Sequence, residues 1–394
     1  MPKLTIDRLP LAGKRVFVRA DLNAPLEDGQ VSDDTRLRAV LPTLRLALDA
    51  GAAVVLASHL GRPKGGPDPK YSLRPVAERL AALLDRPVPL APDCIGEPTR
   101  SQALGLKPGE LLLLENLRFH PEEEKNDDGF ARQLAELADC YVDDAFAAAH
   151  RAHASIDAIT RHLQPAAAGL LMQRELQALG RILEAPERPL VAVLGGAKVS
   201  DKVALVEHLL ARVDALLIGG GMAFTFLRAL GHTIGRSLVE PDRIETARAA
   251  LEAARRRGVH LALPVDAVVA DGLDSASGRA VGIREIPDGQ MGLDIGPRTI
   301  ERFTALLKTA RTIVWNGPMG VFEKPPFAEG TRAVARAVAD ASAFSVIGGG
   351  DTIAAVNMAG VADRIGYIST AGGAFLEFLE GRALPGVDAL TEAA

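Results

Sequence analysis

Short runs of β-branched residues and leucine alternate along the whole chain with segments of helical periodicity. This alternation is typical of parallel sheets in which a helix follows each strand. The clearest predicted strands cover residues 15–18, 53–57, 111–114, 190–194, 215–218, 312–315 and 344–347. The chain is therefore predicted to be an α/β protein with buried parallel strands.

Three of the intervening segments carry clear helix signals. In two of them apolar residues recur at helical spacing: Val76, Leu80, Leu83 and Leu84 behind a Ser72 cap, and Val203, Val206, Leu210 and Val213. In the third, Asp242 and Glu245 form a candidate capping box, and Gly258 is placed to end the helix.

An Ala- and Leu-rich segment, residues 165–183, lies between Pro165 and Pro186 and is predicted to be helical. A new strand is predicted just after Pro189. We interpret the segment as a connecting helix between two α/β lobes. The alternative, on the pattern alone, is one more surface helix of a single sheet. The length of 394 residues, at roughly 150 residues per domain, is compatible with two or three domains.

The composition excludes several classes of protein. With 48% hydrophobic and 24% charged residues, the chain is not expected to be disordered, collagen-like or of low complexity. Its 45 basic and 50 acidic residues give a net charge of −5, which argues against a general affinity for nucleic acid or anionic membranes.

The two cysteines, Cys94 and Cys140, are too few for a disulfide framework or a Cys-rich zinc site, so both are expected to be buried and reduced. Charged residues near the N-terminus stand where a signal peptide would need an apolar stretch, and no run of about 18 uncharged apolar residues occurs. A cytoplasmic location is therefore expected.

In the first half of the chain, polar and basic residues follow the predicted strands. Because open parallel sheets bind ligands at the carboxyl ends of their strands, these residues are expected to converge. Each arginine alone is more often a solvated or helix-capping residue, but together they indicate a pocket for a small polyanion: Arg36, Arg62, Arg118 and Arg151. Asp21 and Asn23 could fix a hydroxyl group of that anion.

In the second half, glycine clusters follow the strands, at residues 194–202, 219–221, 316–323, 348–352 and 370–374. A Gly-rich turn that opens a helix presents backbone N–H groups to phosphate, although a tight turn alone would explain any single cluster. Lys198 and Lys202 add positive charge, and Asp351 is placed to hold a Mg²⁺ that bridges phosphates. This half is predicted to bind a nucleotide.

The nucleotide site is not of a common type. The chain contains no Gly-x-x-x-x-Gly-Lys-Ser/Thr motif, and no Gly cluster completes the Gly-x-Gly-x-x-Gly fingerprint of dinucleotide-binding enzymes. His-Glu-x-x-His and Gly-x-Ser-x-Gly are also absent. A Walker-type NTPase, a Rossmann dehydrogenase, a zinc protease and an α/β-hydrolase are therefore disfavoured.

Over essentially its whole length the sequence resembles the phosphoglycerate kinase family. The segments that carry the resemblance are residues 19–25, 58–63, 115–119, 150–155, 194–202, 219–227, 294–297, 316–323 and 348–352. The resemblance implies two doubly wound parallel-sheet (Rossmann-like) lobes joined by a helix and hinge. One lobe, residues 1–170 with the returning tail 376–394, would bind 3-phosphoglycerate or 1,3-bisphosphoglycerate. After a connecting helix at 171–185, the other lobe, 186–375, would bind ADP or ATP with Mg²⁺.

The family's functional residues are carried over at matching positions. The acyl substrate would contact Asp21, Asn23, Arg36, His59, Arg62, Arg118 and Arg151. The nucleotide would contact Gly196, Lys198, Lys202, Gly220, Gly292, Asn316, Glu323, Gly349, Gly350, Asp351 and Thr352, with Asp351 directed at magnesium. Arg36, Lys198 and the amides of Gly372 and Gly373 would stabilise the migrating phosphoryl group.

Two segments depart from the family's usual sequence. Ala147 and Ala148 stand where the family commonly has Gly and Thr, beside the expected acyl-substrate pocket. Near the end, Ala371 replaces a Gly and Phe375 replaces a Ser. A positive φ at Ala371 would be strained, because a Cβ disfavours that region.

The resemblance implies a monomeric phosphotransferase with a carboxyl group as acceptor, acting by lobe closure and electrostatic stabilisation in glycolysis or gluconeogenesis. Two alternatives remain: a phosphotransferase on the same scaffold for another acyl phosphate, such as acetyl or carbamoyl phosphate, and a catalytically silent two-lobed protein that senses nucleotide or phosphate. The Arg36, Lys198, Lys202 and Asp351 set argues against the silent protein.

Overall fold

The computed structural model describes residues 2–393. Contacts within the chain divide it into two compact units, residues 1–177 with 383–394 and residues 178–382. The first boundary falls inside helix α6 (Leu170–Leu183). The lobe limits expected from the sequence, 170, 186 and 375, differ from these boundaries by several residues. Helix α13 (Gly373–Leu379) belongs to unit 2.

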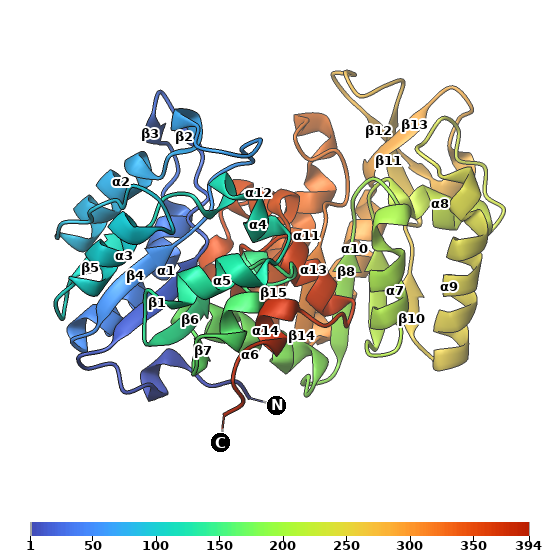
Figure 1. The fold of residues 1–394 in the computed structure, drawn as a ribbon. Coiled ribbons are helices and arrows are strands. Elements are labelled where there is room, and N and C mark those ends of the chain that lie inside the picture. The colour runs from blue at the N-terminus through green and yellow to red at the C-terminus, as the bar shows by residue number, and fades with distance from the viewer. Residues whose placement is uncertain (1, 394) are drawn as a thin grey trace. The chain divides into compact units, whose positions relative to one another are not determined.

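Unit 1 is built on a five-stranded parallel sheet with the order β5-β4-β1-β6-β7 (Figure 1). The strands are β1 (Arg15–Ala20), β4 (Ala53–Ala57), β5 (Leu111–Leu113), β6 (Cys140–Asp144) and β7 (Ala166–Ala168). The helices are α1 (Thr35–Asp49), α2 (Arg74–Leu84), α3 (Glu97–Leu104), α4 (Pro121–Glu124), α5 (Asp128–Ala135) and α14 (Pro385–Asp388). A hairpin of β2 (Leu26–Glu27) and β3 (Gln30–Val31) precedes α1.

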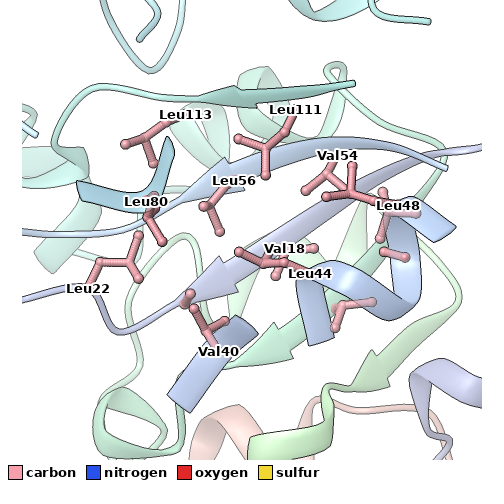
Figure 2. Packing of buried hydrophobic residues seen from close by; sticks show 14 of the residues in the cluster. Val18, Leu22, Val40, Leu44, Leu48, Val54, Leu56, Leu80, Leu111 and Leu113 are labelled. Carbon is pink, nitrogen blue, oxygen red and sulfur yellow. The ribbon is translucent and has the colours of Figure 1, made fainter. Parts of the chain in front are cut away.

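Both faces of this sheet are buried, which explains why most residues of its strands are apolar. Figure 2 shows one face, where Val18 and Leu56 lie against Leu44 of α1 and Leu80 of α2 in one core cluster. On β1 the neighbouring Phe17 points the other way and stacks on Tyr141 of β6, with 6.0 Å between ring centroids.

The two terminal segments pair with each other in unit 1. Lys3 forms an antiparallel bridge with Glu392, and the N–H of Leu4 donates to the carbonyl of Thr391 over 2.8 Å. The amide of Gly386 donates to the carbonyl of Ala149 over 2.9 Å. The C-terminal segment up to Glu392 is therefore part of the first unit's structure.

Unit 2 contains a six-stranded parallel sheet, in the order β10-β9-β8-β14-β15-β16, and a smaller antiparallel sheet, β12-β11-β13 (Figure 1). The parallel strands are β8 (Leu190–Leu194), β9 (Ala215–Ile218), β10 (His260–Ala262), β14 (Thr312–Asn316), β15 (Phe344–Gly348) and β16 (Tyr367–Ser369). The antiparallel strands are β11 (Asp266–Ala270), β12 (Arg279–Gly282) and β13 (Met291–Ile295). The helices besides α13 are α7 (Val203–Leu209), α8 (Met222–Ala229), α9 (Ile244–Arg257), α10 (Pro297–Thr309), α11 (Glu329–Asp340) and α12 (Gly350–Met358).

The prediction of an α/β protein with parallel sheets is confirmed, but several local predictions were wrong. Residues 166–168 form strand β7, so the helix starts only at Leu170. Asp242 does not cap α9, because it lies within a 3₁₀ turn and Arg243 holds the cap position. Ser72 stands one residue before the cap of α2, although its Oγ accepts a bond from the N–H of Arg74 (3.2 Å).

Other local expectations were met. Gly258 follows the last residue of α9 and takes the left-handed conformation at φ 71°, which is common for a glycine at the end of a helix. Cys94 and Cys140 are both buried and free. None of the helices in residues 2–393 combines the length and the apolar character needed to span a lipid bilayer.

Candidate functional site

The first candidate site lies at the carboxyl ends of the unit 1 strands and is centred on His59, directly after β4. The His59 side chain is buried, and burial together with the positive charges of nearby arginines holds its pKa well below the usual range. The arginines that act on it are Arg19, Arg118, Arg36 and Arg151. The structure therefore brings three of the four predicted arginines into one electropositive region.

Each of these arginines is positioned by a different element. Arg36 stands in the first turn of α1 and forms an ion pair with Asp21 from the loop after β1. Arg118 lies in the 3₁₀ turn Leu117–Phe119 after β5, where its Nη1 donates to the carbonyl of Gly61 over 2.8 Å. The Nε of Arg151 donates to His150 over 3.1 Å. Because the loops after four strands and the start of one helix meet here, an anion could contact several guanidinium groups at once.

The remaining predicted residues of this group have different environments. The Oδ1 of Asn23 accepts a bond from the N–H of Gly61 (2.8 Å), so its amide oxygen is used within the chain. Arg62 is exposed, and within residues 2–393 its guanidinium makes no hydrogen bond or ion pair. Ala148, where the family commonly has Thr, packs with Ala145 and Ile156 in a small apolar cluster.

A buried polar network, which the sequence pattern does not reveal, lies behind His59. Arg19 is 1% exposed, and its Nε donates to the Oγ of Ser155 over 2.9 Å. Ser155 in turn donates to Glu123, a fully buried carboxylate. Burial raises the pKa of Glu123, and the positive charge of Arg19 limits this rise. Arg19 lies within strand β1 and is as buried as its neighbours. A buried arginine needs polar partners, so an arginine inside a buried strand is the sequence signal that could have pointed to this network.

The second candidate site is a cavity of about 350 Å³ in unit 2, at the carboxyl ends of β8, β9 and β14. Five of the predicted nucleotide residues line it: Gly196, Gly220, Gly292, Glu323 and Asp351. Apolar side chains such as Phe224, Leu238 and Met291 form most of the rest of its wall, which also includes Asp294. An apolar cleft with a glycine-rich and acidic rim is suited to a ligand with a flat ring and a charged end.

The glycines make room for this cavity. Gly220 has φ 66°, and a Cβ there would lie 2.6 Å from the backbone of Gly196. A Cβ on Gly292 would lie 2.1 Å from Cζ of Phe224. Glycine is therefore required at both positions by close approach of the surrounding chain.

Several predicted polar residues hold the loops of this site together. Lys202 bonds to the side chain of Asn316, whose Nδ2 donates to the carbonyl of Gly348 over 2.7 Å. The Oγ1 of Thr352 accepts a bond from the N–H of Gly317 (2.7 Å). Burial lowers the pKa of Lys202 to about 8, while Asp201 and Asp351 act in the opposite direction.

The charged groups that remain free for a ligand are at the edge of the site. Lys198 is exposed on the loop after β8, and Asp351 is exposed in the first turn of α12. Gly349 precedes that helix at φ 94°, so the amide of Gly350 opens it. An exposed carboxylate at the mouth of a cavity fits a Mg²⁺ ion that keeps waters and takes phosphate oxygens as its other ligands.

The departures near the C-terminus are accommodated without backbone strain at Ala371. Among residues 2–393, a positive φ outside glycine occurs only at Asp28, Asp85 and Asn126. Gly372 takes the positive φ of 53° and caps α13, whose first residue is Gly373. Phe375 is fully buried, and a Cβ on Gly348 would lie 2.5 Å from its ring. The phenylalanine therefore fills the space above a glycine of β15.

Comparison with known proteins agrees with this arrangement. A family model described as phosphoglycerate kinase matches residues 6–382. The chain is 57% identical over 393 residues to a phosphoglycerate kinase of Moorella thermoacetica and 57% identical over 403 residues to one of Acidobacterium capsulatum, in each case over 100% of both chains. Its fold is similar to the phosphoglycerate kinase structure from Coxiella burnetii, with a TM-score of 0.93, 44% identity and 98% of both chains covered. The structure from Pyrococcus horikoshii gives a TM-score of 0.80 at 36% identity, again over 98% of both chains. The chain belongs to the phosphoglycerate kinase family.

Proposed function

We propose that the chain catalyses reversible phosphoryl transfer between 1,3-bisphosphoglycerate and ADP, giving 3-phosphoglycerate and ATP, as a step of glycolysis and gluconeogenesis. The observation that carries this proposal is the convergence of Arg19, Arg36, Arg118 and Arg151 on His59, in a chain that belongs to this family. A phosphorylated hydroxy acid carries two anionic ends, and such a region can bind both.

The two candidate sites receive different substrates. We assign the phosphoglycerate to the lobe of residues 1–170 and 376–394, and the nucleotide to the lobe of residues 186–375, with 171–185 as connecting helix. Arginine forks favour phosphate and carboxylate oxygens, which supports the first assignment. Glycine amides beside an apolar cavity support the second.

In the phosphoglycerate site, Arg62, Arg118 and Arg151 hold the phosphate and carboxylate ends. Asp21 and Asn23 orient the hydroxyl group. With its Nδ1 directed at Arg19, His59 presents Nε2 to the ligand as a neutral hydrogen-bond donor. A neutral ring suits this position. Because Nδ1 accepts from Arg19, the single ring proton of His59 stays on Nε2, and its hydrogen bond to the ligand has a fixed direction.

In the nucleotide site, the cavity takes the base and ribose against Gly220, Gly292 and Glu323. The phosphates extend toward Lys198, Lys202 and the amide of Gly350. Asp351 would hold Mg²⁺, which neutralises phosphate charge when it is bound. Asn316, Gly196, Gly349 and Thr352 keep these loops in place.

The transfer needs no general base, because the carboxylate of 3-phosphoglycerate is already ionised at neutral pH. The difficulty is repulsion between anions, since the loose transition state spreads negative charge over the equatorial oxygens of the phosphoryl group. Arg36, Lys198 and the amides of Gly372 and Gly373 offset that charge, and alignment of the two substrates supplies much of the remaining rate.

Because each lobe holds one substrate, transfer requires the lobes to close, which also excludes water from the phosphoryl group. Small-angle X-ray scattering should therefore show a smaller radius of gyration with both substrates than with either alone. An unchanged radius with both bound would contradict closure. We further propose that the protein is cytoplasmic and monomeric. Analytical ultracentrifugation in the same buffers would check the monomeric state.

The decisive experiment is a coupled assay for ADP formation from Mg-ATP with 3-phosphoglycerate, acetate or carbamate as acceptor. We expect turnover with 3-phosphoglycerate alone. Turnover with acetate or carbamate, and only weak competition by 3-phosphoglycerate, would favour a different acyl-phosphate kinase. Nucleotide binding without transfer to any acceptor would favour a silent binding protein.

A further inference from the structure

Outside both candidate sites, three side chains with metal-binding atoms converge on the surface of unit 1. The carboxylate of Asp93, the thiol of Cys94 and the imidazole of His120 lie with their ligand atoms within 4.8 Å of one another. The first two belong to the loop before α3, and His120 precedes α4, so two separate segments supply the group.

The three groups already interact. Nε2 of His120 lies 2.8 Å from Oδ1 of Asp93, and the same oxygen accepts a bond from the backbone N–H of Cys94 over 2.7 Å. The His120 ring stacks on Phe130 with 5.3 Å between centroids, and Thr99 Oγ1 donates to the carbonyl of Asp93 over 3.0 Å. These contacts fix the ring and the loop before any ion arrives, as partners of metal ligands do.

Access and charge also suit a cation. Cys94 is fully buried, whereas the side chains of Asp93 and His120 are 40% and 24% exposed, so an ion can enter from solvent and meet the sulfur behind them. Burial and the negative charges of Asp93 and Glu123 raise the pKa of the Cys94 thiol, and the hydrogen bond to Asp93 and the charge of Glu122 raise that of His120. A negative field attracts a divalent cation, which in turn favours the thiolate.

We propose that Asp93, Cys94 and His120 form a zinc-binding site. Zn²⁺ prefers sulfur, nitrogen and oxygen donors in a tetrahedron whose ligand atoms are roughly 3.3–3.8 Å apart, so small rotamer changes would close the group around it. Three protein ligands leave a fourth position for water. Binding releases the thiol proton to solvent and involves no oxidation or reduction, because Zn²⁺ has no redox chemistry here.

The site stands apart from the kinase reaction proposed above, so its test does not depend on activity. Calorimetric titration of the full chain with Zn²⁺ in Mg²⁺-free buffer should give one binding site per chain. Co²⁺ as a probe should add a sulfur-to-cobalt charge-transfer band in the near ultraviolet. Alkylation of Cys94, followed by mass spectrometry of its peptide, should slow when Zn²⁺ is present, while alkylation of Cys140 should not.

Variants identify the ligands. Cys94→Ser should remove the charge-transfer band and weaken Zn²⁺ binding by about a hundredfold, and His120→Gln, which can still donate to Asp93, by at least about tenfold. The matched control is His162→Gln, because His162 contacts Asp128 at the same 2.8 Å but has no cysteine beside it. Thermal unfolding of each variant checks the fold, and His120→Gln carries the test if Cys94→Ser does not fold. Absence of stoichiometric Zn²⁺ binding, or binding that survives both substitutions, would overturn the proposal.

Discussion

Nη2 of Arg19 lies 3.1 Å from Nδ1 of His59, and both side chains are buried. Since a guanidinium can only donate, Nδ1 must accept, and the ring proton is assigned to Nε2. This pair turns the histidine into a neutral donor whose orientation is set by a residue that the ligand need not touch.

The first prediction concerns the titration of His59. Burial and the surrounding arginines lower its pKa well below 6.5, so the ring should stay neutral from pH 8 to pH 5. NMR of the ring carbons should show no titration of His59 in that range. In Arg19→Met the ring loses both its partner and a repelling charge, so its pKa should rise. A wild-type midpoint near 6.5 would contradict the assignment.

The second prediction concerns Asp294, which lines the nucleotide cavity and whose pKa burial raises from 3.8 to about 7. The folded chain therefore binds a proton that the unfolded chain has lost, and the resulting stability is fully present below pH 3.8 and lost as the pH rises through 7. Between pH 5 and pH 8 this group should contribute a decrease of about 2–3 kcal/mol in the free energy of unfolding.

Asp294→Asn should remove that part of the pH dependence, which urea denaturation at pH 5, 6, 7 and 8 would measure. The two oxygens of Asp294 now accept the N–H groups of Gly330 (2.7 Å) and Ile295 (2.9 Å), and an amide keeps only one of these acceptors, so stability at pH 5 should fall. Asp288→Asn, at an exposed position, is the control. An identical slope in the wild type and Asp294→Asn would rule out a raised pKa at Asp294.

The third prediction concerns Lys202, whose pKa burial lowers to about 8. The ammonium carries its charge below that pH and loses it above, so the affinity for ADP should fall as the pH rises from 7 to 9.5. In Lys202→Gln this decline should be absent and the affinity at pH 7 already low. Calorimetry with ADP at four pH values tests this, with Lys308→Gln on the exposed face of α10 as control. A decline of equal size in Lys202→Gln would assign it to another group.

The sequence predicts the architecture better than it predicts individual roles. Strands β4, β8 and β9 are predicted residue for residue, because strands buried on both faces are uninterrupted apolar runs. Strand β7 consists of three alanines, which carry little strand preference, and so it was assigned to the helix that follows. The small antiparallel sheet was missed for other reasons. Gly292 and Asp294 interrupt the apolar run of β13, and two of the four residues of the edge strand β12 are exposed.

The roles of single residues depend on contacts between distant segments. Arg19 is supported by Ser155 and Glu123, more than a hundred residues away, and no local pattern announces this network. The glycine clusters were predicted to bind phosphate, and the family resemblance added Gly292 as a nucleotide contact. Gly220 and Gly292 are, however, required first by close packing. Only the folded structure shows which glycines face a ligand and which are required by close packing against neighbouring residues.

The fourth prediction concerns Gly292. Because a Cβ there would lie 2.1 Å from Cζ of Phe224, Gly292→Ala should push the ring into the cavity and lower the affinity for ADP by at least about tenfold. The double variant Gly292→Ala with Phe224→Leu should recover part of the loss. Gly289→Ala, whose Cβ would meet no atom within 4 Å, is the matched control. If Gly292→Ala binds ADP as tightly as Gly289→Ala, the nucleotide does not use this wall.

The last prediction concerns Arg36, the residue to which the mechanism assigns charge stabilisation from the phosphoglycerate side. Arg36→Ala should lower kcat by roughly two to four powers of ten, as removal of a transition-state charge clamp commonly does. The Kd for ADP should change little, because Arg36 lies in unit 1 and the nucleotide cavity lies in unit 2.

Arg38→Ala is the matched control, since Arg38 lies on the same helix but pairs with Asp34 and is 57% exposed. Steady-state kinetics with saturating 3-phosphoglycerate, together with calorimetry for ADP, separate turnover from binding. Arg36→Lys should recover little, because an ammonium lacks the planar fork that meets two oxygens at once. Equal kcat in Arg36→Ala and Arg38→Ala would mean that Arg36 only forms an ion pair with Asp21. The negative charge of the transition state would then have to be offset by groups of the nucleotide site.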